Sequence, residues 1–170
     1  MTDPATVVLD TSVLLNFVKI QRIDLLGSLG VPILLLEDVL AEVTHPAHRA
    51  IVDRAVADGV LLRETVSDLA EVTLFAELAQ SGRLGPGERA TMAVALTRGM
   101  AAAIQERPAQ AEMHRRDRRA RIVTTEDIVV HAIRSGTVGL PEADAMLVEW
   151  RKRHRFASRV VTFRQFFPGD

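Results

Sequence analysis

The stretch ATVVLDTSVLLNFV, residues 5–18, places one acid and two hydroxyl residues between two apolar segments. The first segment ends at Leu9 and is apolar at consecutive positions, which is typical of a parallel strand that helices cover on both faces. The second segment carries apolar residues at helical spacing, namely Val13, Leu14, Phe17 and Val18. Asp10 therefore falls where a buried strand ends and a helix begins.

The rest of the chain continues to alternate between strands and helices. Further strands are expected at 31–36, 60–66, 100–104 and 122–124, and helices at 38–43, 47–59, 68–82, 88–99, 107–116, 127–135 and 141–154. Ser67 is expected to cap the helix at 68–82. The alternation predicts a three-layer α/β/α sandwich around a mainly parallel, roughly five-stranded sheet. We expect one domain over 1–170, with a core of about 5–135 and a helical tail of about 140–170.

The composition limits the classes of protein that the chain can represent. Hydrophobic residues make up 48% and charged residues 25% of 170 residues, which indicates a globular fold. The absence of cysteine excludes disulfides, zinc ribbons and thiol catalysis. No stretch has membrane-spanning character and the first residues lack a signal-peptide pattern, so we expect a cytoplasmic protein without a membrane partner. The net charge of −1 hides two basic clusters, at 115–121 and 151–155.

Acidic residues follow several of the expected strands. In open parallel sheets, ligands bind beyond the carboxyl ends of the strands, so these acids should share one edge. Carboxylates gathered in a cleft repel one another unless a cation neutralises them, and hard oxygen ligands select Mg²⁺ or Mn²⁺. Such a site can activate water against a phosphodiester. The acids are Asp10, Glu42, Glu88, Glu106, Glu126 and Asp127.

Each acid also has a purely structural interpretation. Asp10 is a typical cap for the helix that follows it, and Glu88 would complement a helix dipole. Glu126 and Asp127 are more typical of helix caps than of metal ligands. Glu42 is different, because it lies beside the buried side of its helix, where an unpaired carboxylate is unfavourable. The joint occurrence of these acids at one sheet edge favours a shared site.

Three segments, VVLDTSVLLNF, LLLEDVLAEV and LGPGERATMAVAL, together resemble the PIN-domain family, whose best-populated branch comprises the ribonuclease toxins of bacterial toxin–antitoxin pairs. The later stretch at 121–156 is also similar, so the resemblance covers nearly the whole chain. It implies that Asp10, Glu42 and Glu88 bind a divalent ion. It further implies that Thr11 or Ser12 orients Asp10 or a metal-bound water.

The chain departs from the family pattern after the fourth strand. Many relatives have an aspartate pair where this chain has Gln105-Glu106. Glu106 would then supply the fourth acid, or Glu126 and Asp127 would substitute from the next strand. A rival alignment takes Thr124-Thr125-Glu126-Asp127 as the fourth motif and treats 107–120 as an insertion.

The leading hypothesis is therefore an Mg²⁺- or Mn²⁺-dependent endoribonuclease that cuts single-stranded RNA. The alternative, motivated by Gln105, is a module that binds RNA or protein without cutting. A phosphotransferase with Asp10 as nucleophile is disfavoured because Ser12 stands where a second acid is usual. The resemblance also implies a small antitoxin partner and a homodimer. Contacts to RNA phosphates are expected from the basic residues Arg115, Arg116, Arg118, Arg119, Arg151 and Arg153.

Overall fold

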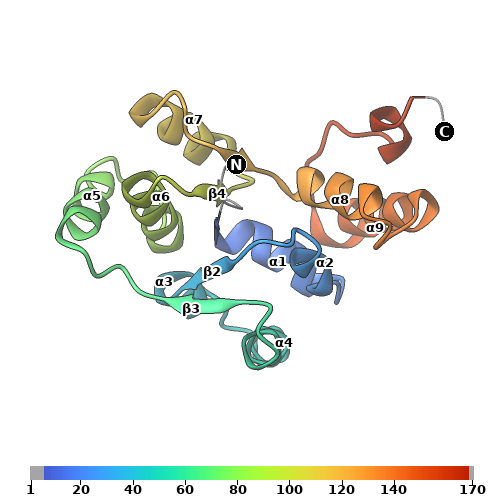
Figure 1. The fold of residues 1–170 in the computed structure, drawn as a ribbon, viewed down its shortest axis with the longest axis horizontal. Helices are drawn as coiled ribbons and strands as arrows, with labels where there is room; N and C mark the ends of the chain where they lie inside the picture. Colours follow the sequence, from blue (N-terminus) through green and yellow to red (C-terminus); the bar gives the residue numbers. More distant parts are fainter. Residues whose placement is uncertain (1–5, 169–170) are drawn as a thin grey trace.

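The computed structural model describes residues 6–168, and its strands form one all-parallel sheet. The five strands lie in the order β3-β2-β1-β4-β5. Helices cover both faces, with α5 and α6 on one side and α1, α2, α8 and α9 on the other (Figure 1). This confirms the expected three-layer α/β/α sandwich. The strands are β1 (Val7–Leu9), β2 (Ile33–Leu36), β3 (Leu62–Glu64), β4 (Ala101–Ala103) and β5 (Ile122–Val123).

The helices follow the expected positions closely, although their ends differ by a few residues. Only α7 has the expected bounds at both ends. Two short elements, α2 and the 3-10 helix η1, were not expected. The helices are α1 (Thr11–Lys19), α2 (Asp24–Gly27), α3 (Glu37–Glu42), α4 (Pro46–Ala57), α5 (Leu69–Ala79), α6 (Pro86–Arg98), α7 (Arg107–Arg116), α8 (Thr125–Arg134), α9 (Leu140–His154) and η1 (Phe163–Phe166).

The cap of α5 corrects the expectation for Ser67. Asp68 is the N-cap, and its Oδ1 accepts a hydrogen bond from the backbone N–H of Ala70 at 2.8 Å. The Glu71 carboxylate in turn accepts from the backbone N–H of Asp68, which completes a capping box. Ser67 lies one residue too early to reach the first-turn amides in this way.

The path of the chain through the sheet creates a switch point between β1 and β4. The chain passes from β1 to β2 and β3 on one side, and then crosses to β4 on the other side of β1. Leu9 is in register with Ala103, and the Asp10 N–H donates to the Ala103 carbonyl at 3.1 Å. Crevices at such switch points, beyond the carboxyl ends of the strands, are where open α/β sheets bind ligands. Asp10 lies at this point.

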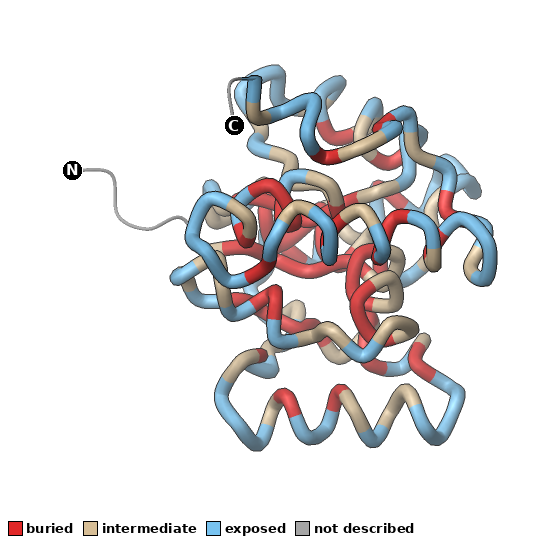
Figure 2. The backbone as a smooth tube through the Cα atoms, turned by 90° about the vertical axis from the view of Figure 1, so that its right-hand side faces the viewer, coloured by how far each residue is buried: buried red, intermediate tan, exposed pale blue. Residues whose placement is uncertain are grey.

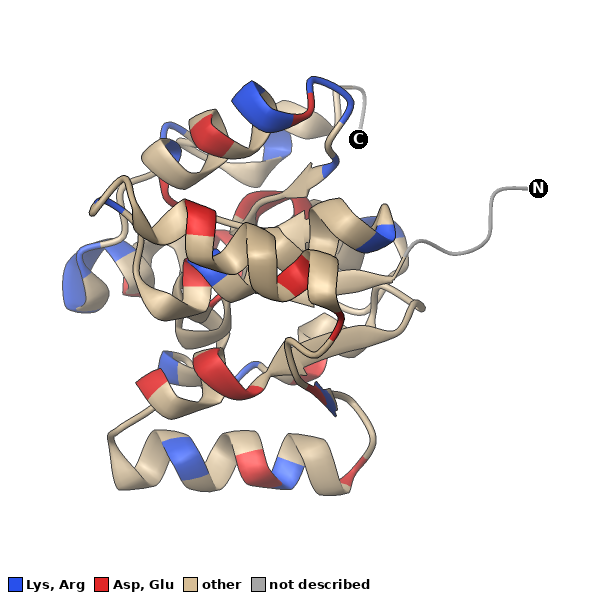
Figure 3. Ribbon diagram, turned by 90° about the vertical axis from the view of Figure 1, so that its left-hand side faces the viewer, with Lys and Arg blue, Asp and Glu red and all other residues tan. Residues whose placement is uncertain are grey.

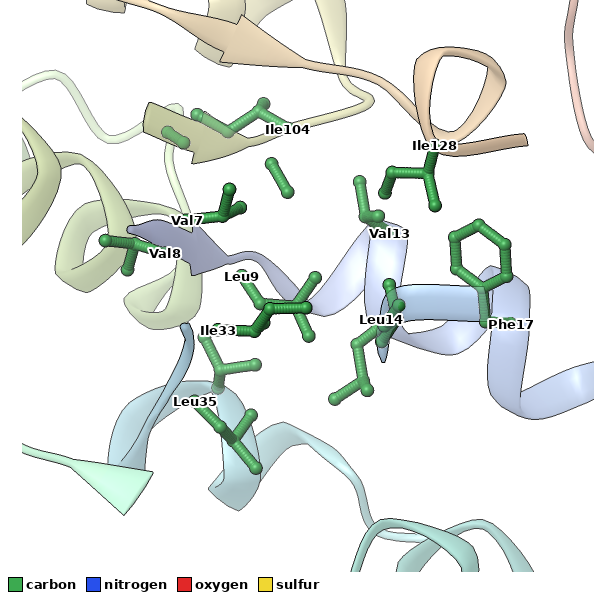
Figure 4. Packing of buried hydrophobic residues seen from close by; sticks show 14 of the residues in the cluster. Val7, Val8, Leu9, Val13, Leu14, Phe17, Ile33, Leu35, Ile104 and Ile128 are labelled. Atoms are coloured by element: carbon green, nitrogen blue, oxygen red, sulfur yellow. The ribbon is translucent and has the colours of Figure 1, made fainter. Parts of the chain in front are cut away.

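One buried apolar cluster joins the sheet to the helices on both faces (Figure 2). Trp150 of α9 packs edge-on against Phe17 of α1, and its Nε1 donates to the Asn16 carbonyl at 2.7 Å. These contacts fix the C-terminal helix on the helix that follows Asp10. The expectation of one domain with a helical tail stays a prediction. Figure 4 shows the packing around β1, including Val8, Leu9, Leu14, Phe17, Ile33 and Leu35.

Candidate active site

Asp10 both caps a helix and presents an unsatisfied oxygen. Its Oδ2 accepts from the backbone N–H of Ser12 at 3.3 Å and from the Ser12 hydroxyl at 2.6 Å. Its Oδ1 is buried and has no hydrogen-bond partner within residues 6–168. Burial raises the pKa of Asp10, and the charge of Glu42 raises it further. A buried carboxylate oxygen without a partner is rare in proteins and calls for a ligand or another explanation.

Glu42 is held by two donors at the junction of α1, α3 and α6. The Thr11 hydroxyl donates to its Oε2 at 2.5 Å, and the Gly87 N–H donates to its Oε1 at 2.8 Å. Gly87 is buried, and a Cβ there would lie 2.7 Å from the Thr11 Oγ1 and 2.9 Å from the Glu42 Oε2. Only glycine therefore allows the start of α6 to approach Glu42 this closely.

Glu88 connects the acids electrostatically. Its Oε2 accepts from the Gly85 N–H at 2.9 Å, which confirms a role at the start of α6. Burial raises the pKa of Glu88, and the negative charges of Asp10, Glu106 and Glu42 raise it further, in that order. Glu88 thus lies close enough to three other carboxylates, each from a separate segment, for their charges to act on it.

Gln105 interacts with the first turn of α8. Its Nε2 donates to the Glu126 Oε2 at 3.1 Å, while its Oε1 accepts from the Thr125 N–H at 2.9 Å. Glu126 also accepts from the Ser158 hydroxyl at 2.6 Å. A second carboxylate at position 105 would repel Glu126, so the amide suits this position better than an acid would. Asp127 forms a capping box with Thr124, as its structural interpretation predicted.

Glu106 stands apart from these contacts. It is exposed and precedes α7 as its N-cap residue, without a side-chain capping hydrogen bond. It lines a cleft of about 1020 Å³, together with Ser12 and Gln105. Because Ser12 lines the cleft and donates to Asp10, the cleft passes beside Asp10 at the switch point.

The chemistry of the acids fits a hard divalent ion, but their side chains are not arranged as a finished metal site. Within residues 6–168, no three histidine, aspartate or glutamate side chains are placed to hold one ion together. Glu42 and Glu88 instead accept hydrogen bonds from Gly87 and Gly85. Rotation of these two side chains would be needed before they could share an ion with the free oxygen of Asp10.

The basic residues expected to contact RNA lie in different environments. Arg115 pairs with Glu112, and Arg116 pairs with Glu112 and Glu77. Arg151 donates to the carbonyls of Ser158 and Val160, whereas Arg118, Arg119 and Arg153 are exposed. On the face drawn in Figure 3, basic and acidic residues are interspersed. Their role in RNA binding stays a prediction.

Two polar residues beside the cleft were missed by the sequence interpretation. Asn16 lies four residues after Ser12, which places it on the same side of α1, and its Nδ2 donates to the Thr125 hydroxyl at 2.9 Å. A polar residue within the apolar helix pattern was the available signal. Ser158 offered no such signal, because its contact with Glu126 joins residues 32 positions apart.

The all-parallel sheet, with Asp10 at the β1/β4 switch point, defines an open α/β fold in which this edge is the expected ligand site. The chain belongs to the PIN-domain family, because the family's model matches residues 6–163. PIN domains are generally nucleases that act on nucleic acids and typically use divalent metal ions. Neither the curated proteins nor the solved structures gave a match. Within residues 6–168, every helix is too short or too polar to cross a membrane.

Proposed function

We propose that the protein is an Mg²⁺- or Mn²⁺-dependent endoribonuclease that cleaves single-stranded RNA. The observation that supports this proposal most strongly is that the charges of Asp10, Glu106 and Glu42 all act on Glu88, while the buried Asp10 Oδ1 has no hydrogen-bond partner within residues 6–168. Such a group of acids is electrostatically unfavourable unless a cation is bound. The proposed catalytic and metal-binding acids are Asp10, Glu42, Glu88 and Glu106.

The residues of the chain have separate tasks in this proposal. A bound divalent ion would acidify a water molecule and offset charge on the scissile phosphate. Ser12 fixes the orientation of Asp10, and Thr11 holds Glu42, through the hydrogen bonds described above. Glu106, exposed in the cleft, would accept a hydrogen bond from the attacking water and orient it.

The decisive experiment compares RNA cleavage by the wild type, Asp10→Asn and Asp68→Asn. Both aspartates are helix N-caps, and asparagine caps helices as well as aspartate does. Only Asp10 lies at the proposed site. We expect Mg²⁺- or Mn²⁺-dependent cleavage in the wild type and in Asp68→Asn, and no cleavage in Asp10→Asn or with chelator. Cleavage that survives chelation, or that survives in Asp10→Asn, would exclude the metal-nuclease proposal.

The fourth acid is tested by a second pair of variants. Glu106→Gln should lower kcat by about 100-fold, the scale of a lost acid–base group. Glu126→Gln should change kcat much less, because Glu126 already accepts hydrogen bonds from Gln105 and Ser158. A larger loss in Glu126→Gln would favour the alternative in which the acids after β5 serve as the fourth motif.

The second candidate function is a module that binds RNA or protein without cutting. It is favoured by the placement of Glu42 and Glu88, which accept backbone hydrogen bonds instead of forming a finished metal site within residues 6–168. In the cleavage experiment, this function predicts RNA binding with no product at any Mg²⁺ or Mn²⁺ concentration.

The antitoxin and the homodimer also belong to this proposal. On α5, Leu78 is buried and Leu74 and Phe75 are partly buried, so they pack within the chain. Leu69 and Val72 are instead exposed, with 81% and 47% of their surface accessible. We propose this pair as the contact for a second copy. Light scattering should show a dimer for the wild type and a monomer for Leu69→Ser with Val72→Ser, whereas a monomeric wild type would exclude this contact.

A further inference from the structure

Four basic side chains in the cleft beside the acids have no acidic partner among residues 6–168. Lys19, Arg107, Arg155 and Arg159 line the cleft, and none of them forms an ion pair with another described residue. The arginines that do form ion pairs belong to other parts of the surface. Glu106, Glu126 and Asp127 also line the cleft, but they pair with none of these four cations, which leaves the cations available to attract an anionic ligand.

An exposed aromatic ring lines the same cleft. Phe166, in η1, has 38% of its surface accessible, while Phe163 of the same turn is buried and lies 6.3 Å away, measured between ring centroids. Phe163 therefore anchors the turn, and Phe166 presents its ring to the cleft. Cations beside an exposed aromatic ring are the usual means of binding an unpaired nucleic-acid strand, because the cations contact phosphates and the ring stacks on a base.

Hydrogen bonds at several points fix the segment from Arg155 to Phe166, which we call the C-terminal wall. The Ser158 hydroxyl donates to Glu126 at 2.6 Å, and Arg151 donates to the Ser158 carbonyl at 3.1 Å. Further along, the Thr162 hydroxyl and the Phe163 N–H both donate to Asp144 at 2.7 Å. The wall is thus held in place before any ligand binds, which lowers the entropic cost of binding.

We propose that the C-terminal wall binds an unpaired RNA strand and leads it along the cleft to the carboxylates at the switch point. This inference rests on the proposed nuclease function. Arg155 and Arg159 would contact phosphates, and Phe166 would stack on a base. The path would end beside the acids, because Glu106 lines the cleft and Ser12, which also lines it, donates to Asp10. The volume of about 1020 Å³ is at the top of the range for ligand pockets, which suits a few unpaired nucleotides.

The test measures binding of a fluorescent ten-nucleotide RNA by anisotropy, in chelator so that no cleavage occurs. Arg155→Ala with Arg159→Ala should weaken binding about tenfold or more, as expected for two lost charged contacts. It should also lower the slope of log K against log salt by about 1.4, because each phosphate contact on a single strand contributes about 0.7. The matched control, Arg54→Ala with Arg63→Ala, removes the same charge from exposed ion pairs and should leave both values unchanged.

A second pair of variants tests the aromatic contact. Phe166→Leu keeps an apolar side chain beside Phe163 and should weaken RNA binding about fivefold or more, since the ring can no longer stack. Phe167→Leu is the control, because it removes a ring that packs on Arg134, and it should leave the affinity for RNA unchanged. A duplex of the same length should bind the wild type more weakly than the single strand, and Phe166→Leu should not change its affinity.

The inference would be overturned if the wall pair and the control pair lost affinity for RNA equally, or if only Arg118→Ala with Arg119→Ala lost affinity. It would also be overturned if an equal concentration of inorganic phosphate displaced the RNA. The outcome is independent of catalysis. RNA binding at the wall without cleavage in Mg²⁺ would uphold this inference and reject the nuclease proposal. Cleavage in Mg²⁺, with RNA binding unaltered in the wall variants, would uphold the nuclease proposal and reject this inference.

Discussion

The Asp10 carboxylate accepts two hydrogen bonds from Ser12 through Oδ2, while its buried Oδ1 has no partner within the described chain. Burial raises the pKa of Asp10 above its ordinary value of 3.8, so the folded chain binds more protons than the unfolded chain just above that pH. The free energy of unfolding therefore falls as the pH rises through the interval between the two pKa values. The titration of Glu88 changes the free energy of unfolding in the same direction, because burial also raises the pKa of Glu88.

We therefore predict that Asp10→Asn stabilises the metal-free protein at neutral pH. The variant should raise Tm by about 2–4 °C, which corresponds to about 1 kcal/mol for a chain of this size. The gain should disappear below about pH 4, where the wild-type carboxyl is protonated. Thermal denaturation across pH measures this effect. Asp68→Asn should show no gain at any pH, and a lower Tm for Asp10→Asn at neutral pH would contradict the interpretation of Asp10 as a destabilised acid.

Gly87 supports a second prediction at the residue scale. A methyl group there would lie 2.7 Å from the Thr11 Oγ1 and 2.9 Å from the Glu42 Oε2, so Gly87→Ala must displace these side chains, and with them the Thr11–Glu42 contact, or the start of α6. We expect a loss of about 1–3 kcal/mol in the free energy of unfolding, as for other overpacked sites. Chemical denaturation measures it. Gly27→Ala, where the new methyl would lie 3.8 Å from Val60, is the control and should not destabilise. Equal stability of the two variants would contradict the close approach.

At the scale of elements, an ion pair between the buried Glu71 and the partly buried Arg98 joins α5 to α6, the helix that carries Glu88. Glu71 is 1% exposed, and its Oε1 accepts from the Arg98 Nε at 2.6 Å. Arg98 lowers the pKa of Glu71, so this stabilisation is present above about pH 4.5 and is lost as the pH falls below that value.

Glu71→Gln should accordingly lower the free energy of unfolding by about 2 kcal/mol at neutral pH, because Arg98 would lose its buried partner. Urea denaturation at pH 7 and pH 3 measures this difference, which should shrink at the lower pH. Glu77→Gln breaks an exposed pair with Arg116 and should cost well under about 1 kcal/mol. If Glu71→Gln lowered the free energy of unfolding no more than Glu77→Gln does, the ion pair between Glu71 and Arg98 would not stabilise the packing of α5 on α6.

The elements that could be predicted from the sequence are those with strong local patterns. The consecutive apolar residues of β1 and β2 indicated buried parallel strands, and the bounds of α7 agreed at both ends. The predicted cap of α5 was wrong. Ser67 and Asp68 are adjacent and both residue types cap helices well, so only the observed geometry shows that Asp68 is the N-cap. Element η1 was missed because its four residues depend on contacts with Asp144 of α9.

At the scale of the whole molecule, the sequence indicated which acids follow which strands, but it did not indicate the contacts between them. The order of the strands decides that β1 and β4 are neighbours, and this order depends on chain crossovers that no local pattern encodes. The contacts of Glu126 with Gln105 and Ser158 also join segments far apart in the sequence. From the sequence, Gln105 motivated the alternative of a module that does not cut RNA. The structure adds that its side chain contacts Glu126 and Thr125, and that alternative stays a prediction.

At the scale of the whole molecule, we predict that a bound divalent ion stabilises the folded chain. If the acids bind an ion only in the folded state, Mn²⁺ at about 100 times its Kd should raise Tm by about 5–10 °C. Differential scanning fluorimetry measures this shift, which should saturate with Mn²⁺ concentration. Asp10→Asn should lose most of the shift, and Asp68→Asn should keep it. Equal shifts in both variants would mean that the ion binds elsewhere.

The most direct measurement is the anomalous scattering of Mn²⁺ in a crystal of the wild-type protein grown with this ion. The account predicts one strong peak beyond the ends of β1 and β4, within coordination distance of the Asp10 Oδ1 and of at least one carboxylate of Glu42, Glu88 or Glu106. Asp10→Asn crystals grown in the same way should lack the peak. Manganese bound elsewhere, with Asp10 still without a ligand, would contradict the claim that these acids form a divalent-metal site.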